Sequence, residues 1–147
     1  MRKPNVLFVC GGNSCRSQMA EAFLRKHGGD RFEAHSCGLE AGGIHPLTIE
    51  VMQEAGIDLV ADGHRAQQVS EYLGELPVAY LISVCDAAAK RCPAVWPGAR
   101  HRLVWPFDDP PAHPGDEDEK RGKFREVRDQ IEQRIVAWLD ELDREAR

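Results

Sequence analysis

The sequence predicts an α/β protein in which a four-stranded parallel sheet lies between two layers of helices. Apolar, strand-like runs alternate with amphipathic helices along its 147 residues, and this alternation is typical of parallel sheets covered on both faces. The composition, 42% hydrophobic and 29% charged, is that of a globular domain with a sizeable core. Neither a repeat nor a linker divides the chain, so we expect one domain over residues 1–147.

The first half of the chain alternates twice between strand and helix. The predicted elements are a strand at 6–9, a helix at 18–26, a strand at 32–36 and a helix from 46 to about 55. In the first helix, Met19, Ala22, Phe23 and Lys26 share one face. Gly38 follows the second strand. Pro46 suits the first turn of the second helix, and Gly56 is placed to end it.

The second half adds two strands and a long helix. A short helix is predicted at 70–73, a buried strand at 78–84 (VAYLISV) and a weaker strand at 102–105, which Pro106 ends. The long helix carries apolar residues at steps of three and four: Phe124, Val127, Ile131, Ile135, Trp138 and Leu142. We expect the acidic residues 116–119 to precede it, where they interact favourably with the helix dipole.

Charge and cysteine content narrow the class of protein. A net charge of −5 argues against nucleic-acid binding, which normally shows a basic stripe. The apolar run near the N-terminus is shorter than that of a signal peptide, and no run approaches the roughly 20 residues of a membrane helix. We therefore expect a monomeric cytoplasmic protein without a membrane partner. Because thiols stay reduced there, its five cysteines are not expected to form structural disulfides.

The stretch VLFVCGGNSCRSQMAE, residues 6–21, predicts an anion site with a cysteine nucleophile. Gly11 and Gly12 permit a sharp turn whose N–H groups face inward, and the following helix adds positive charge at its N-terminus. Arg16 supplies a planar fork for a tetrahedral oxyanion. These donors also stabilise a thiolate at Cys10, as does the Ser17 hydroxyl. The glycine spacing excludes a dinucleotide loop. A buried cysteine at a strand end is the simpler alternative, which Arg16 and the glycines disfavour.

A second pair of thiols follows the strand at 78–84. Cys85 and Cys92 flank DAAAKR, which favours a helix. In a helix their Cα atoms are about 10 Å apart, whereas a disulfide needs roughly 4.4–6.8 Å. A bond between them therefore requires unwinding, for which Pro93 marks a weak point. Two unrelated buried cysteines remain an alternative, and the spacing fits a zinc site poorly.

The segment WPFDDPPAHPG places two aspartates after the last predicted strand. Because ligands bind at the carboxyl ends of parallel strands, we expect this segment to lie beside Cys10. A carboxylic acid held there can protonate a leaving oxygen. We favour Asp109, directly before Pro110, over Asp108. The alternative is that both are ordinary turn residues.

Four motifs together resemble one family. VCGGNSCRSQMAEAF, HSCG, VCDAAAKRCP and WPFDDP are similar, in this order, to thioredoxin-coupled arsenate reductases built on the low-molecular-weight tyrosine phosphatase fold. The resemblance implies that arsenate is held by Arg16 and the loop amides, and that Asp109 protonates the departing oxygen. The implied substrate-binding residues are Gly11, Gly12, Asn13, Ser14, Cys15 and Arg16.

The resemblance further implies a relay of three thiols. Cys10 attacks arsenate, Cys85 then attacks Cys10 to release arsenite, and Cys92 attacks Cys85. The resulting Cys85–Cys92 disulfide is reduced by thioredoxin, so no tightly bound cofactor is expected. The positions of Asn13 and Ser17 match those that support the loop and the thiolate in the family. We interpret the side chain of Cys15 as structural.

Three positions depart from the family pattern. Gly11 stands where threonine is usual, and Cys37 where alanine is usual; we interpret Cys37 as a packing residue. Some family members bind potassium through residues matching Asn13, Glu21 and Ser36 plus an aspartate. Arg65 aligns with that aspartate, so we expect no metal and hypothesise that its guanidinium replaces the ion.

Two other function classes stay open. A low-molecular-weight phosphatase would use the same loop through a phosphocysteine, but it has no need of Cys85 and Cys92. A non-enzymatic arsenite or metal sensor would need converging thiolates without redox turnover. The basic element with which such a sensor would bind DNA is missing from the sequence.

Overall fold

The computed structural model describes residues 3–12, 15–40, 42–72, 76–85 and 98–146. One sheet contains the strands β1 (Asn5–Cys10), β2 (Glu33–Gly38), β3 (Tyr80–Ser83) and β4 (His101–Val104). Their order is β2-β1-β3-β4, and every neighbouring pair is parallel. The predicted four-stranded parallel sheet is confirmed, with β1 and β3 as its inner strands.

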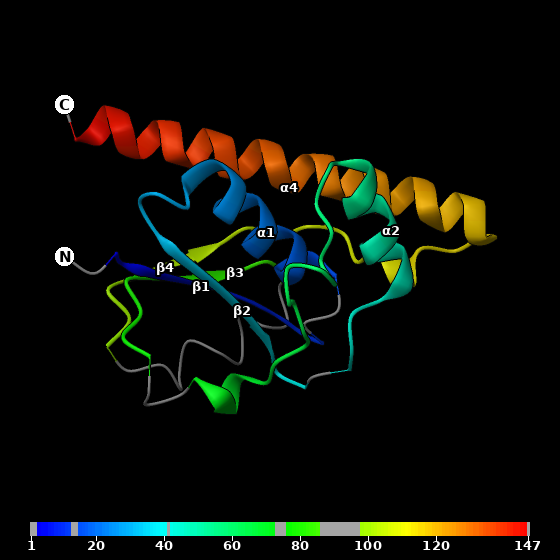
Figure 1. The fold of residues 1–147 in the computed structure, drawn as a ribbon, viewed down its shortest axis with the longest axis horizontal. Helices are drawn as coiled ribbons and strands as arrows, with labels where there is room; N and C mark the ends of the chain where they lie inside the picture. The colour runs from blue at the N-terminus through cyan, green and yellow to red at the C-terminus, as the bar shows by residue number, and fades with distance from the viewer. Residues whose placement is uncertain (1–2, 13–14, 41, 73–75, 86–97, 147) are drawn as a thin grey trace.

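The helices complete the three-layer α/β/α fold. They are α1 (Arg16–Gly28), α2 (Pro46–Glu54), α4 (Glu117–Glu145) and the one-turn 3₁₀ helices η1 (Val69–Glu71) and η3 (Pro110–Ala112). In Figure 1, α1 and α4 cover one face of the sheet with α2 against α4, while η1 lies on the opposite side. Within the described residues, none of the helices combines the length and apolar composition needed to span a bilayer.

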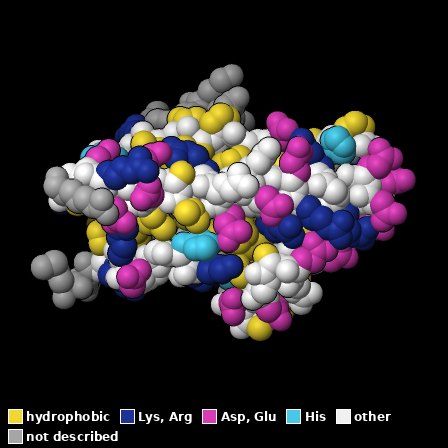
Figure 2. Space-filling model, turned by 90° about the horizontal axis from the view of Figure 1, so that it is seen from above, with side chains coloured by type: hydrophobic (Ala, Val, Ile, Leu, Met, Phe, Trp, Pro, Cys, Tyr) yellow, Lys and Arg dark blue, Asp and Glu magenta, His cyan; other side chains and the backbone are white. Residues whose placement is uncertain are grey.

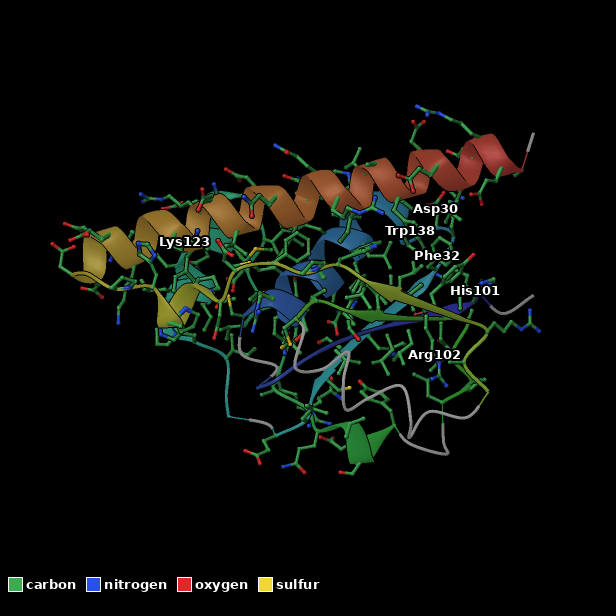
Figure 3. All side chains as sticks on the ribbon, turned by 180° about the vertical axis from the view of Figure 1, so that it is seen from behind. Asp30, Phe32, His101, Arg102, Lys123 and Trp138 are labelled. Carbon is green, nitrogen blue, oxygen red and sulfur yellow. The ribbon has the colours of Figure 1, made fainter. Side chains whose placement is uncertain are left out.

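The core forms where β1 and α4 meet α1. Residues 6–9 of β1 are fully buried, as expected for a central strand covered on both faces. The apolar stripe of α4 is buried as its spacing predicts, except that Leu142 is only partly covered. Trp138 stacks on Phe32 at 5.4 Å between ring centroids (Figure 3). It also meets Tyr80 and Trp105 edge-on. This aromatic cluster attaches α4 to the sheet.

Several element boundaries differ from the sequence-based expectation. The second strand continues to Gly38 because Cys37 and Gly38 keep pairing with β1. The strands expected at 78–84 and 102–105 are shorter or shifted, at 80–83 and 101–104. The short helix expected at 70–73 is the single 3₁₀ turn η1, which a capping box between Gln68 and Glu71 closes. Its predicted last residue, Leu73, lies outside the described residues.

The acidic run before the long helix forms its first turn. Asp116 is the N-cap and accepts a hydrogen bond from the backbone N–H of Glu119 at 2.9 Å, while the Glu119 carboxylate accepts from the N–H of Asp116. Glu117, Asp118 and Glu119 are helical rather than preceding the helix. The predicted electrostatic reason still holds, since all four carboxylates lie at the positive end of the helix dipole.

An ion-pair network joins α2 to the amino-terminal half of α4. Arg121 pairs with Glu50, and Arg125 and Arg128 both contact Glu54, at 2.7 and 2.9 Å. Figure 2 shows acidic and basic side chains side by side at this end of the molecule. Hydrogen bonds from Arg125 lower the pKa of Glu54 to about 2.

We expect Glu54→Gln to remove part of the acid sensitivity of folding. Because the folded pKa of Glu54 lies below its unfolded value, its stabilising effect is present above about pH 4.5 and is lost as the pH falls towards 2. The side chain is 36% exposed, so solvent screening limits the effect to about 1 kcal/mol. Urea unfolding at pH 3.5 and pH 7 measures this difference, with Glu145→Gln as control. If Glu54→Gln lowered the free energy of unfolding equally at both pH values, the stabilising effect of Glu54 would not come from its ion pairs.

Candidate active site

The candidate site begins where β1 ends and α1 starts. Cys10 is the last residue of β1, and Arg16 is the first of α1. The Cys10 sulfur lies 2.9 Å from the hydroxyl oxygen of Ser17, and both residues are buried. The fold therefore brings the predicted nucleophile and its hydroxyl partner into hydrogen-bond distance. Asn13 and Ser14 of the predicted cradle lie outside the described residues.

The segment Leu39–Gly42 orients the loop from outside. The N–H groups of Leu39, Glu40 and Gly42 donate to the carbonyl oxygens of Cys10, Gly11 and Gly12, at 3.1, 3.0 and 3.2 Å. In a trans peptide the carbonyl and the following N–H point in opposite directions. The N–H groups of Gly11 and Gly12 therefore point away from this segment. The sequence-based predictions did not include the segment after β2. The available signal was its position, because β2 ends at the same edge of the sheet as β1.

Arg16 joins this loop to the segment after β4. Its side chain is 13% exposed; one terminal nitrogen donates to the carbonyl oxygen of Phe107 at 3.0 Å, and the other lies 3.6 Å from the Asp109 carboxylate. Asp108 instead pairs with Lys123 at 2.7 Å, and this contact lowers the pKa of Asp108. Of the two aspartates, Asp109 is therefore the one beside Arg16, the arginine predicted to bind the anion.

Cys15, the residue directly before α1, is buried. Burial raises the pKa of its thiol to about 12, and the hydrogen bond with Thr48 of α2 offsets only part of this effect. The thiol is therefore neutral at physiological pH and is a poor nucleophile. Cys37, in β2 beside Val9, is fully buried in the core.

Cys85 lies at the same edge of the sheet as Cys10. Val9 of β1 pairs in register with Ser83 of β3, and the N–H of Val84 donates to the Val9 carbonyl at 3.0 Å. Cys85 follows directly and is buried. Among the described residues, the four cysteines (Cys10, Cys15, Cys37 and Cys85) form no disulfide. Cys92 lies outside the described residues.

We expect Ser17→Ala to slow alkylation of Cys10 by iodoacetamide about tenfold at neutral pH. A hydrogen bond to a charged group contributes about 1.5–3 kcal/mol, and in the variant the attacking sulfur loses its hydroxyl partner. Mass spectrometry of the Cys10 peptide measures the rate, and Ser83→Ala, another buried serine at the neighbouring strand end, is the control. A rate equal to that of the unchanged protein would mean that Ser17 does not stabilise the thiolate.

Glu21 and Ser36 match residues that bind potassium in the family, and Arg65 was expected to replace the ion beside them. The structure arranges these residues differently. The Ser36 hydroxyl donates to the buried Glu21 carboxylate at 2.9 Å. Arg25 and His64 approach the second carboxylate oxygen at 3.2 and 3.1 Å. Arg65 points elsewhere: it pairs with Glu71 and is 64% exposed.

The hypothesis that the Arg65 guanidinium replaces the ion is therefore wrong, because the guanidinium beside Glu21 is that of Arg25. Burial raises the pKa of Glu21, and the charge of Arg25 opposes this shift. Within the described part of the chain, no cluster of three or more histidine, cysteine or acidic side chains is placed to hold a metal ion.

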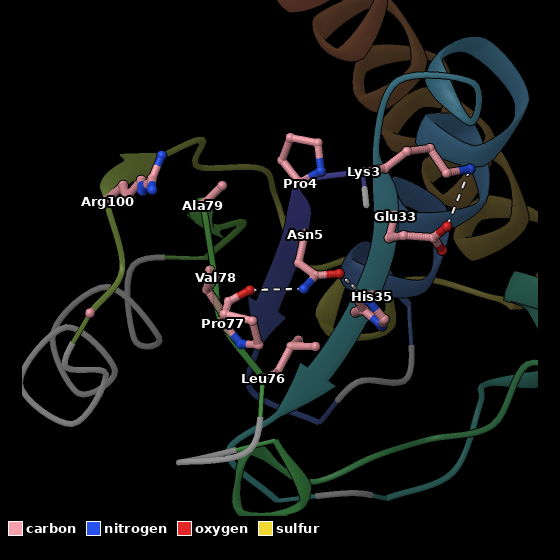
Figure 4. Close-up of a pocket in the computed structure, with 11 residues that line it drawn as sticks. Lys3, Pro4, Asn5, Glu33, His35, Leu76, Pro77, Val78, Ala79 and Arg100 are labelled. Carbon is pink, nitrogen blue, oxygen red and sulfur yellow. Dashed lines mark hydrogen bonds and ion pairs between the residues drawn. The ribbon is translucent and has the colours of Figure 1, made fainter. Parts of the chain in front are cut away.

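A hollow of about 930 Å³ lies at the opposite edge of the sheet. It is lined by residues at the amino ends of the strands, among them Asn5, Glu33 and His35. Figure 4 shows their contacts: Asn5 donates to the Pro77 carbonyl at 2.8 Å, and Lys3 pairs with Glu33. These groups satisfy one another, and the hollow is separate from the edge that carries Cys10.

Comparisons with known proteins agree with this geometry. A family model described as low molecular weight phosphotyrosine protein phosphatase matches residues 5–147. An arsenate reductase of Bacillus licheniformis is 43% identical over 143 residues, which cover 95% of this chain and 98% of that protein. A solved arsenate reductase in the reduced state is 31% identical with a TM-score of 0.75, covering 95% of this chain and 98% of the other.

A thioredoxin-dependent arsenate reductase of Corynebacterium glutamicum is similar over 96% of this chain and 62% of its own, at 26% identity and a TM-score of 0.69. The full-length family match and the relative at 43% identity are sufficient to assign the family. The chain belongs to the low-molecular-weight phosphotyrosine protein phosphatase family, within which it resembles the arsenate reductases.

Proposed function

We propose that this protein is an arsenate reductase that converts arsenate to arsenite through three cysteines and is regenerated by thioredoxin. The observation that carries the proposal is the position of two thiols, Cys10 and Cys85, at the ends of adjacent parallel strands. Arg16 and Ser17 flank the first of them. A phosphatase needs only one such thiol, whereas reduction of arsenic needs a second sulfur to take part in the electron transfer.

The first step is attack of the Cys10 thiolate on arsenic. A sulfur–arsenic bond forms, one arsenic–oxygen bond breaks, and the oxygen leaves as water after accepting a proton from Asp109. Arg16 and the N–H groups of the loop neutralise the oxyanion. The contacts made by Leu39 and Glu40 support this role, because they turn the carbonyl groups away and so leave the N–H groups of Gly11 and Gly12 available to an anion.

The second step reduces the arsenic. The Cys85 thiolate attacks the Cys10 sulfur, a Cys10–Cys85 disulfide forms, and the electron pair of the sulfur–arsenic bond passes to arsenic. Arsenic(V) becomes arsenic(III) and leaves as arsenite, while the two sulfurs are oxidised together by two electrons. The burial of both sulfurs supports this step, since it limits competing hydrolysis of the adduct.

The third step moves the disulfide to a place that a reductant can reach. Cys92 attacks Cys85, which releases Cys10 as a thiolate, and a thioredoxin dithiol reduces the Cys85–Cys92 disulfide. This step rests on the sequence resemblance and on the thioredoxin-dependent relative. We accordingly propose a monomeric, single-domain cytoplasmic enzyme without a tightly bound cofactor.

Phosphatase activity is the second candidate function. The family match favours it, since the same loop, with Arg16 and Asp109, can form a phosphocysteine at Cys10. In that case Cys85 and Cys92 take no part in the reaction.

An assay of the unmodified protein decides between the two functions. Arsenite production from arsenate is measured with thioredoxin, thioredoxin reductase and NADPH, and hydrolysis of p-nitrophenyl phosphate is measured in parallel. We expect stoichiometric NADPH oxidation and arsenite release. Rapid aryl phosphate hydrolysis without arsenite would assign the protein as a phosphatase instead.

A further inference from the structure

We propose that Lys123 is a positioning residue that holds Asp109 in place for proton transfer. The proposal concerns the acid loop, residues 106–110, and rests on the proposed function, in which Asp109 is the general acid. Lys123 belongs to α4 and is far from the reacting sulfur in the sequence, so no motif points to it.

Lys123 forms a tertiary ion pair with the acid loop. Its ammonium nitrogen donates to the Asp108 carboxylate at 2.7 Å, across 15 residues of sequence. The Lys123 side chain is only 18% exposed, although Asp108 is largely in solvent. Figure 3 shows Lys123 in the amino-terminal half of α4, at the end of the helix where η3 lies. The aliphatic part of the Lys123 side chain is therefore largely covered, while its ammonium group contacts the acid loop.

Lys123 also has an ion-pair partner within its own helix. Glu126, one turn further along α4, contacts the same ammonium nitrogen at 2.7 Å. A pair at this spacing lies on one helix face, so Glu126 restricts the rotamers of Lys123. Less side-chain entropy is then lost when the contact with Asp108 forms.

The two residues directly before Asp109 are anchored, and the residue after it is buried. Arg16 binds the Phe107 carbonyl at 3.0 Å, Lys123 binds Asp108, and Pro110 begins η3, which contacts α4. The Asp109 carbonyl accepts a hydrogen bond from the N–H of Ala112 at 3.1 Å, while its carboxylate lies 3.6 Å from Arg16 and the side chain is 50% exposed. Its neighbours therefore fix its backbone, while its carboxyl group stays accessible to a leaving oxygen. General acids act only within hydrogen-bond reach, so this placement controls the rate.

The test measures a single round of arsenite release from the reduced protein, without thioredoxin. We expect Lys123→Met to lower this rate about tenfold at an unchanged half-saturating arsenate concentration, because the cradle is intact while the acid is displaced. Lys123→Arg should restore most of the rate. Lys120→Met, which makes the same substitution one turn earlier in α4, is the matched control and should have an effect below about twofold.

Double variants separate positioning from general destabilisation. Asp109→Asn alone should lower the rate about a hundredfold, and adding Lys123→Met should cause no further loss. A tenfold loss from Lys123→Met in the Asp109→Asn background would overturn the positioning role, as would an undiminished rate in Lys123→Met alone. If Lys123→Met does not fold, as judged by circular dichroism, Asp108→Asn removes the same contact from the loop side and carries the same expectations.

Failure of the proposed function has a different signature. If the unmodified protein releases no arsenite, the reductase assignment fails, and the same variants are compared on p-nitrophenyl phosphate, whose hydrolysis uses the same acid. If Asp109→Asn does not change the rate with either substrate, Asp109 is not the general acid. The proposed positioning role of Lys123 is then wrong as well.

Discussion

Replacing Cys85 by serine is expected to abolish NADPH-linked turnover with arsenate while leaving oxyanion binding unchanged. Cys85 is buried at the end of β3, beside the strand that ends in Cys10. A serine hydroxyl fits the same space, but it cannot attack the Cys10 sulfur to release arsenite. The cradle comes from a different part of the chain, residues 10–16, and should therefore bind phosphate as before.

Cys37→Ala is the matched control for this variant. Cys37 is also a buried cysteine, in the strand on the other side of β1, and it packs in the core. The Cys37→Ala variant should lose some stability but keep the turnover number of the unchanged protein. Coupled NADPH oxidation measures turnover, and isothermal titration with phosphate measures binding. Turnover by Cys85→Ser at even a tenth of the normal rate would contradict an obligatory second thiol.

The parts of the site that the sequence predicts are those encoded within a few residues. Cys10, Arg16 and Ser17 lie within one strand–loop–helix unit, so the turn and the helix start bring them together without knowledge of the rest of the fold. The sheet was predictable for a similar reason, because the apolar runs 6–9 and 78–84 each signal a buried strand. The carboxyl-edge rule then placed Cys85 and the acid loop beside Cys10.

The parts that the sequence did not predict depend on tertiary contacts. Nothing near Lys123 indicates that Asp108 will meet it, and the backbone donors of Leu39–Gly42 carry no side-chain signature at all. The error at Arg65 has the same origin. The family resemblance suggested that Arg65 lies near Glu21, but the Arg65 side chain pairs with Glu71 instead. The true neighbour, Arg25, is four residues after Glu21 in α1, a spacing from which the contact could have been inferred.

Arg16→Lys is expected to lower kcat/KM for arsenate about a thousandfold, although it keeps the positive charge. The arginine donates to the Phe107 carbonyl through one terminal nitrogen and approaches Asp109 through the other. Lysine has one ammonium group, which cannot contact the acid loop at two points and also bind an oxyanion in a bidentate manner. Loss of one preorganised oxyanion donor costs about a hundredfold to a thousandfold, and displacement of Asp109 adds to this loss.

Steady-state kinetics with arsenate and titration with phosphate separate the two parts of this effect. Weaker phosphate binding reports the lost bidentate contact, and a lower kcat at saturating arsenate reports the displaced acid. Arg100→Lys, at the amino end of the sheet, tests the same substitution away from the site and should change neither quantity. If Arg16→Lys retained kcat/KM within threefold, charge alone would be sufficient. The guanidinium could then not be the link that makes the anion loop and the acid loop one active site.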